Sequence, residues 1–167
     1  MTSGGRIVFE ELIRFDCGRL VPPVRSLAGV DEAGRGALAG PVVAAAVICE
    51  PAACLSRVRD SKLVSEKERE ALHALIMERC IAWGVGAVDP GEIDRINILR
   101  ATLKAMKLAV EALAPSPDLV LVDGTYLPDI AFPAAAITGG DRKSFSIAAA
   151  SIVAKVTRDR IMREHAE

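Results

Sequence analysis

The segment AGVDEAGRGALAG, residues 28–40, places two neighbouring carboxylates, Asp31 and Glu32, directly after a short apolar run. Three glycines and one arginine follow the two acids. A buried carboxylate must be paired, hydrogen-bonded or bound to a metal, because its desolvation otherwise costs several kcal/mol. The segment therefore predicts a partner for this acidic pair, and its glycines predict a sharp turn between two strands.

Apolar strands are predicted on both sides of this turn, over residues 24–30 and 42–48. Because the turn is short, we expect the two strands to be antiparallel neighbours. Further outward, Ser65 followed by Glu68 forms a capping box that predicts the start of a helix at Ser65. Other strands are expected over residues 83–86, 118–124 and 134–138, and a last helix over 144–162. This order of elements predicts an α/β fold in which helices pack on a mixed sheet.

One further helix is predicted from a long apolar stripe. From Gly91 on, apolar side chains recur every three or four residues as far as Leu113, which indicates one continuous helix lying on the sheet. Asn97 lies beside this stripe, where a structural, capping role is favoured over phosphate binding. Pro115 and Pro117 then end the helix.

Composition indicates a single soluble domain. The chain has 167 residues, of which 51% are hydrophobic but only 4% aromatic, so small aliphatic side chains must build the core. The longest apolar run, residues 42–49, is far shorter than the ~20 residues that a membrane-spanning helix needs. Charges at Arg6, Glu10 and Glu11 argue against a signal peptide, so we expect a cytoplasmic protein with no membrane partner. The net charge of −1 leaves nucleic acid binding to a local patch or to bound cations.

The cysteines and the N-terminal residues carry weaker signals. The four cysteines contain no C-x-x-C pair and the two histidines lie far apart, so reduced thiols are expected rather than a zinc site or disulfides. Residues 1–23 have weak periodicity and end in Val21-Pro22-Pro23, which predicts an N-terminal arm. The domain is therefore expected over residues 24–167.

Three predicted strands end in the same way, with an acid beside glycine. The segments AGVDEAG, LVLVDG and ITGGD contribute Asp31 with Glu32, Asp123 and Asp141. If these strand ends meet at one edge of the sheet, the four carboxylates repel one another and require divalent cations. All-oxygen ligation suits Mg²⁺ or Mn²⁺, and two such ions can activate water and stabilise the leaving oxygen of a phosphodiester. The pattern then indicates a nuclease or a phosphotransferase.

Two observations weigh against that interpretation. Asp before Gly is common turn chemistry, so each acid taken alone is better explained as a turn or cap residue. Consecutive strand residues also point to opposite faces, so Asp31 and Glu32 can share a site only if the strand ends or bulges there. Gly34 and Gly36 allow such an exit.

Five segments closely resemble the bacterial type 2 ribonucleases H, the ribonuclease HII family: GVDEAGRGALAGPVVAAAV, DSK, EIDRINILRATLKAM, LVDG and GGDRKSFSIAAASIVAKVTRDR. The resemblance covers residues 27–163. It implies a ribonuclease H-like fold, with a mixed five-stranded sheet flanked by helices. It also implies a monomeric endoribonuclease that hydrolyses the RNA strand of RNA–DNA hybrids. Such an enzyme also cuts 5′ to ribonucleotides embedded in duplex DNA and uses two Mn²⁺ or Mg²⁺ ions.

The resemblance also implies roles for individual residues. Asp31, Glu32, Asp123 and Asp141 match the family's catalytic, metal-binding acids, and Gly34, Arg35 and Gly36 match the loop whose backbone reads the ribose 2′-hydroxyl. Glycines suit this task because they let the backbone approach the one group that separates RNA from DNA. Arg35 is expected either at a substrate phosphate or in a surface salt bridge. Lys62 of the DSK segment is a candidate for binding substrate phosphate, although a solvated loop lysine is the favoured explanation.

A basic set near the fourth acid has two explanations. It comprises Arg142, Lys143, Lys155, Arg158 and Arg160. These side chains form either a patch that tracks phosphates or the ordinary solvated face of a helix.

The chain departs from the family pattern in three places. Gly139 stands where the family usually has lysine, and DSKLVS replaces DSKKLS. Family members continue past the position of Glu167 into a segment resembling HKGYGT, so the domain is expected to lack that C-terminal segment. The tyrosine of that segment is not replaced by Tyr126, which follows Asp123 instead. The alternatives are a truncated, weakly active or inactive nucleic-acid-binding relative, or another nuclease of similar fold such as a resolvase or transposase core.

Overall fold

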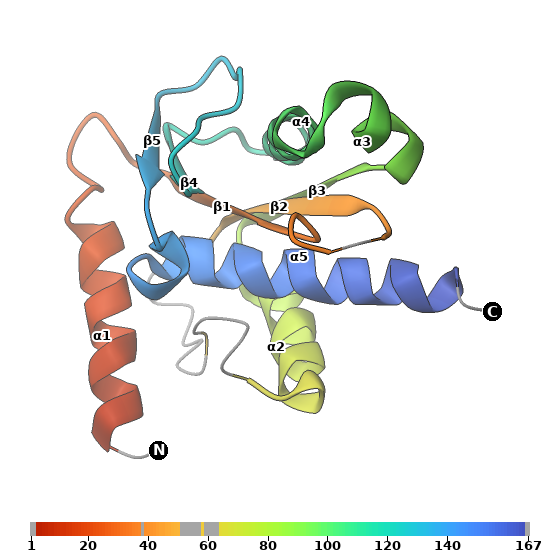
Figure 1. The fold of residues 1–167 in the computed structure, drawn as a ribbon. Coiled ribbons are helices and arrows are strands. Elements are labelled where there is room, and N and C mark those ends of the chain that lie inside the picture. Colours follow the sequence, from red (N-terminus) through yellow and green to blue (C-terminus); the bar gives the residue numbers. More distant parts are fainter. Residues whose placement is uncertain (1–2, 38, 51–57, 59–63, 166–167) are drawn as a thin grey trace.

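The computed structural model describes residues 3–37, 39–50, 58 and 64–165 of the chain, and its five strands form one sheet between helices (Figure 1). The strands are β1 (Leu27–Ala33), β2 (Val42–Ile48), β3 (Ala82–Val88), β4 (Leu119–Asp123) and β5 (Ala134–Ile137). The helices are α1 (Ser3–Cys17), α2 (Glu66–Arg79), α3 (Pro90–Ile96), α4 (Ile98–Glu111), α5 (Phe145–Glu164) and the short 3₁₀ turn η2 (Gly140–Arg142). Within these ranges, no helix has the length and apolar character needed to cross a membrane.

The sheet is mixed, with the strand order β3-β2-β1-β4-β5. β2 pairs antiparallel with both β1 and β3, whereas β4 pairs parallel with both β1 and β5. This confirms the predicted α/β fold and the antiparallel pair around the glycine-rich turn. β1 begins and ends three residues later than the predicted range of 24–30, so Asp31 and Glu32 belong to the strand rather than to the turn.

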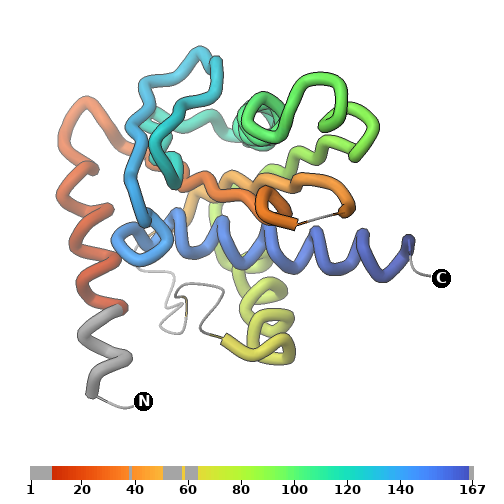
Figure 2. The backbone as a smooth tube through the Cα atoms, viewed as in Figure 1, coloured from red at the N-terminus to blue at the C-terminus, as the bar shows by residue number. Residues whose placement is uncertain are grey.

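Helices cover both faces of the sheet. α3 and α4 lie on one face, and α5 crosses the other with α2 beyond it, as the backbone trace in Figure 2 also shows. The helices come close because the strands carry glycine at the points of contact. A Cβ on Gly84 of β3 would collide with the backbone carbonyl of Ala109 in α4, and a Cβ on Gly29 of β1 would collide with the backbone of Ser146 in α5. Small residues therefore set the distances between the sheet and the helices on its two faces, as the composition predicts.

The segment predicted as an N-terminal arm contains a helix that packs on the domain. Leu12 of α1 is 1% exposed and belongs to the core between the sheet and α5. The ring of Phe9 meets the ring of Phe145 edge-on, with centroids 5.9 Å apart. The described part of the predicted N-terminal arm is therefore ordered, and its helix α1 packs against the domain.

The single helix predicted over residues 91–113 is divided in two at Asn97. This residue has φ of 72° and ψ of 162°, a conformation that lies outside the left-handed helical region and that residues other than glycine rarely adopt. Its backbone N–H donates to the carbonyl of Ile93 at 2.9 Å, which ends α3, and its side-chain oxygen accepts the N–H of Arg100 at 3.1 Å, which starts α4. The predicted capping role is confirmed. The prediction of one continuous helix is wrong. Residues on both sides of the break pack into the same core, so the apolar stripe in the sequence continues across the break and conceals it.

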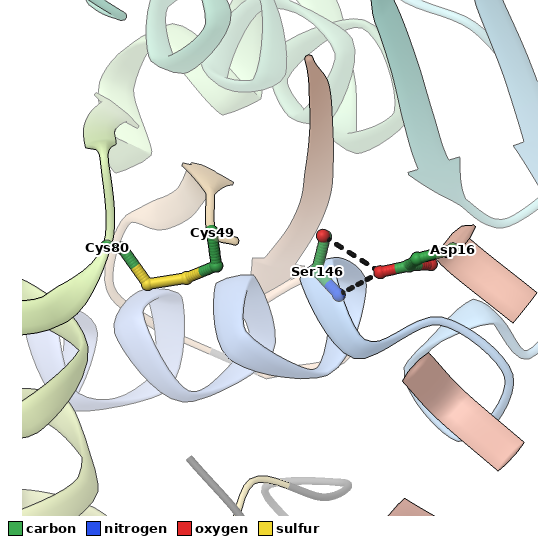
Figure 3. Close-up of a disulfide and its surroundings, with 4 residues drawn as sticks. All are labelled: Asp16, Cys49, Cys80 and Ser146. Carbon is green, nitrogen blue, oxygen red and sulfur yellow. Dashed lines mark hydrogen bonds between the residues drawn. A yellow bond between two sulfur atoms is a disulfide. The ribbon is translucent and has the colours of Figure 1, made fainter. Parts of the chain in front are cut away.

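Cys49 and Cys80 are joined by a disulfide, which corrects the expectation of reduced thiols (Figure 3). Their Cα atoms are 4.4 Å apart. Cys49 directly follows β2 and Cys80 comes shortly before β3, and the N–H of Ile81 donates to the carbonyl of Ile48 at 2.8 Å. The antiparallel pairing of β2 with β3 therefore brings the two cysteines together. Spacing along the sequence could not reveal this, because the strand register decides which residues meet.

Candidate active site

Asp31 and Asp123 lie level with each other on neighbouring strands. The parallel register pairs Val30 of β1 with Val122 of β4, so the next residue of each strand is one of these acids. Side chains alternate along a strand, and Gly29, two residues before Asp31, lies against the backbone of α5. Both acids therefore lie on the α5 side of the sheet, at the end of the ladder between β1 and β4.

Glu32 joins them without a break in its strand. β1 remains paired with β2 through Ala33, so the strand neither ends nor bulges at Glu32, contrary to the condition set from the sequence. The pairing of β1 with β4 stops at Val30, which leaves the β4 side of β1 open beside both acids. We attribute the proximity of Asp31 and Glu32 to the end of this parallel ladder.

Asp141 approaches the same end of the β1–β4 ladder from η2, the 3₁₀ turn after β5. Gly139 precedes this turn with φ of 63°, a left-handed conformation that glycine adopts without strain. The N–H of Gly140 donates to Oδ1 of Asp123 at 2.6 Å, which fixes the turn to the end of β4. Asp141 is buried, and its charge acts on Asp31. The charges of the other three acids that the sequence singles out, Glu32, Asp123 and Asp141, therefore all act on Asp31.

The electrostatics of these acids are unfavourable when no cation is bound. Burial is the main reason that the pKa of Asp31 is raised well above its usual range, and the charges of Glu32, Asp123 and Asp141 raise it further. The pKa of Glu32 is also raised, first by burial, while Arg35 opposes the rise and Asp123 adds to it. A divalent cation would reverse these effects, because it favours the ionised form of every oxygen around it.

The donor set fits a hard divalent cation. Within the described residues, Oε2 of Glu32 is buried and has no hydrogen-bond partner. All four candidate ligands are carboxylates, and Mg²⁺ and Mn²⁺ prefer such oxygens to nitrogen or sulfur. In the same part of the chain, no three His, Cys, Asp or Glu side chains are already gathered closely enough to hold a metal ion. Coordination of a cation would therefore require these carboxylates to approach one another more closely than they do here.

The predicted substrate-binding loop leaves β1 beside these acids. Gly34 has φ of 100°, a conformation that residues with side chains rarely adopt. A Cβ on Gly36 would meet nothing within 4 Å among the described atoms, so the space beside it is open. Nη1 of Arg35 lies 3.6 Å from Oε1 of Glu32, and its side chain is 44% exposed. Arg35 therefore forms the salt bridge given as its alternative role. Lys62 lies outside the described residues.

The predicted basic set is divided among separate contacts. Lys143, Lys155 and Arg160 are engaged with Thr138, Asp159 and Glu70 respectively. Arg142 is exposed, with Nε 3.9 Å from Oδ1 of Asp141. Arg158 instead donates to backbone carbonyls between β1 and β2. Sequence reasoning missed this contact because the partners lie 117 and 119 residues away, and no local pattern indicates them.

Comparison with known proteins extends these observations. The family model for ribonuclease HII matches residues 28–167. The chain is 55% identical over 136 residues to the ribonuclease HII of Idiomarina loihiensis, covering 81% of this chain and 73% of the relative. It is 56% identical over 138 residues to the ribonuclease HII of Acetivibrio thermocellus, covering 83% of this chain and 54% of the relative. The crystal structure of the ribonuclease H2 from Pyrococcus horikoshii OT3 matches with a TM-score of 0.71 at 29% identity, over 83% of this chain and 74% of that one.

Proposed function

Because the chain belongs to the ribonuclease HII family, a family of hydrolytic endonucleases, we propose that it hydrolyses the RNA strand of RNA–DNA hybrids. We further propose that it cuts duplex DNA on the 5′ side of embedded ribonucleotides and leaves a 3′-hydroxyl and a 5′-phosphate. The proposed partner is therefore an RNA–DNA hybrid or DNA that contains ribonucleotides. A cytoplasmic monomer is sufficient for this activity, since one chain carries all four acids.

The observation that carries the proposal is the level position of Asp31 and Asp123 at the end of one parallel ladder. Glu32 adds a buried oxygen without a hydrogen-bond partner in the described structure. Asp141 adds a fourth carboxylate whose charge acts on Asp31. Burial and neighbouring acids raise the pKa values of Asp31 and Glu32, which is costly unless a cation binds among the four acids, so this end of the sheet favours function over stability.

The four acids would hold two divalent cations, Mn²⁺ or Mg²⁺, which when bound supply an activated water and stabilise the leaving oxygen. Backbone donors orient two of the acids in advance. The N–H of Glu32 donates to Oδ1 of Asp31 at 2.7 Å, and the N–H of Gly140 donates to Oδ1 of Asp123 at 2.6 Å. The bond to Asp31 favours the ionised form of that carboxylate, which coordination requires.

The glycine-rich loop is the proposed reader of the substrate. Gly34, Arg35 and Gly36 follow the acidic pair after one intervening residue, and the open space beside Gly36 supports a close approach of substrate to the backbone. We assign the ribose 2′-hydroxyl to this backbone, and we assign substrate phosphate to Arg35 once its contact with Glu32 is exchanged. Lys62 is assigned to phosphate from the sequence alone.

The direct test is cleavage of a labelled DNA duplex that carries one ribonucleotide, in Mn²⁺ or Mg²⁺. We expect one cut on the 5′ side of the ribonucleotide, no cut with EDTA, and no cut in the matching all-DNA duplex. A longer ribonuclease HII serves as the positive control. If that control cuts and this chain does not, the proposal is overturned. Salt-dependent binding without turnover would then favour an inactive nucleic-acid-binding relative, and cleavage of the all-DNA duplex would indicate another nuclease of similar fold.

A further inference from the structure

Arg158 of α5 braces the connection between β1 and β2. The described residues of this connection, 34–37 and 39–41, are termed the glycine loop. Nε of Arg158 donates to the carbonyl oxygen of Pro41 at 3.0 Å, and Nη2 donates to the carbonyl oxygen of Ala39 at 2.9 Å. Both bonds are charge-assisted, and the planar guanidinium fixes the angle between them. One side chain thus holds two carbonyls where the loop rejoins the sheet.

The glycines near the two ends of the glycine loop fit around that side chain. Gly34 has φ of 100° and Gly40 has φ of 92°. A Cβ on Gly34 would collide with Nε of Arg158, and a Cβ on Gly40 would collide with Sδ of Met162, about one turn further along α5. A larger residue at Gly40 would displace α5 side chains, and one at Gly34 would also collide with the backbone carbonyl of Pro41. The loop and the face of α5 therefore constrain each other.

This packing connects Arg158 to the proposed reader of the ribose. Gly34 directly follows β1, and Arg35 and Gly36 come next in the chain. The N–H of Ala37 donates to the carbonyl of Gly34 at 3.2 Å, so these residues form one turn. A displacement of Gly34 would therefore move the backbone that is assigned to the 2′-hydroxyl.

We propose that Arg158 is a positioning residue that fixes the glycine loop in the conformation that reads the ribose 2′-hydroxyl. This inference rests on the proposed function. Arg158 acts through the loop and does not itself contact substrate phosphate. It affects the choice of substrate more than cation binding, because β1, β4 and η2 position the four acids.

Three variants test the loop without any substrate. Arg158→Met removes both donors, Arg158→Lys keeps the charge without the planar fork, and Arg160→Met is a matched control on the same helix whose partner is Glu70. The measurement is hydrogen exchange at the backbone amides of residues 34–37. We expect faster exchange, above all at Ala37, in both Arg158 variants. Exchange in Arg160→Met should match the wild type.

A second measurement separates reading of the ribose from binding of phosphate. It compares the KM for a duplex with one ribonucleotide with the inhibition constant of the matching all-DNA duplex. Both Arg158 variants should raise KM by roughly ten- to a hundredfold, because the reading backbone is misplaced, and should leave the inhibition constant unchanged. A phosphate contact would instead raise both constants, and lysine would restore them. That result would overturn the proposal.

The outcomes keep the two proposals apart. If the wild type cuts and both Arg158 variants retain its KM and its loop exchange, the positioning role is wrong. If the wild type does not cut, the proposed function fails, and exchange at Ala37 still decides whether Arg158 fixes the loop. If circular dichroism shows that Arg158→Met does not fold, Arg158→Lys carries both measurements.

Discussion

Asp16 and Asp31 are both buried carboxylates, but one is surrounded by donors and the other by acids. Oδ2 of Asp16 accepts the N–H of Ser146 at 2.8 Å and its hydroxyl at 2.9 Å, at the start of α5 (Figure 3). Asp31 faces the charges of Glu32, Asp123 and Asp141. The start of a helix stabilises an anion, whereas neighbouring anions destabilise it. Asp16 therefore anchors α1 to α5, while Asp31 requires a further partner.

An unpaired oxygen does not by itself distinguish the two regions. Oδ1 of Asp16 and Oε2 of Glu32 are both buried without a hydrogen-bond partner among the described atoms. Burial is also the main cause that raises the pKa of Asp16, as it is for Asp31. Hydrogen bonds at the start of α5 oppose the rise for Asp16, whereas neighbouring charges add to it for Asp31. The neighbours, and not burial, indicate which acid is structural and which is functional.

The largest effect is expected when one of the four acids at the end of the β1–β4 ladder is replaced. Asp123→Asn should slow cleavage of the ribonucleotide duplex by roughly a thousandfold or more, because a neutral amide cannot complete the cation site. Asp118→Asn is the control near the opposite end of β4, where Asp118 accepts the backbone N–H groups of Arg25 and Ser26 at 2.8 and 3.0 Å. It should leave the rate unchanged. Single-turnover rates decide, and equal losses in both variants would point to misfolding instead of a lost ligand.

The next effect concerns the region that uses its buried acid for stability. Asp16→Ala should lower the free energy of unfolding by about 2 to 3 kcal/mol, because the N–H and hydroxyl of Ser146 lose their acceptor in a buried place. Asp16→Asn keeps one acceptor oxygen and should cost less. Urea denaturation measures both changes. The structural assignment of Asp16 would be wrong if neither variant lost stability.

The opposite sign is expected at Asp31. In EDTA, Asp31→Asn should raise the free energy of unfolding by about 1 to 2 kcal/mol, because it removes a buried charge that faces three other acids. Its oxygen can still accept the N–H of Glu32. Adding Mn²⁺ should raise the unfolding temperature of the wild type and not that of the variant. Thermal unfolding with and without Mn²⁺ measures these shifts, and a loss of stability in EDTA would contradict the comparison.

The smallest effect is expected for an acid at the surface. Glu70 receives hydrogen bonds from Arg160 at 2.6 Å and Arg163 at 3.0 Å, and the bond from Arg160 is the main cause that lowers its pKa. The stabilisation that ionised Glu70 gives to the folded protein is therefore present above the ordinary carboxyl pKa. It is lost as the pH falls through the lowered pKa of Glu70. Glu70→Gln should cost about 0.5 kcal/mol at neutral pH, and less in high salt.

Urea denaturation at neutral and acidic pH measures the Glu70→Gln effect. Glu78→Gln is the control for an exposed acid on the same helix. The side chain of Glu78 is 70% exposed, and its Oε1 lies 3.8 Å from Nε of Arg79. If Glu70→Gln lowered the free energy of unfolding as much as Asp16→Ala, an exposed acid would stabilise this protein as much as a buried one, which would contradict the comparison.

Local signals explain which parts of the fold could be predicted from the sequence. β2 spans the predicted residues 42–48, because a continuous apolar run between turns has few alternative structures. Ser65 caps α2 as predicted, with its hydroxyl oxygen accepting the N–H of Glu68 at 3.3 Å. Both features depend on residues within a few positions of one another.

Long-range contacts explain what could not be predicted. The four acids could be named because each lies within two residues of a glycine near the end of an apolar strand, but only the register of Val30 with Val122 places Asp31 beside Asp123. The anchor between Asp16 and Ser146 joins residues 130 positions apart, so nothing near Asp16 indicates it. The roles of Asp16 and Arg158 thus depend on packing that the local pattern does not encode.

The bond between Cys49 and Cys80 also has a topological result, because it closes a covalent ring across 31 positions of the chain. A protease that cleaves once inside this ring would leave two fragments still linked through sulfur. One fragment would carry β1 and β2 and the other would carry β3, β4 and β5, yet they would run as one band on a gel until a reductant separated them.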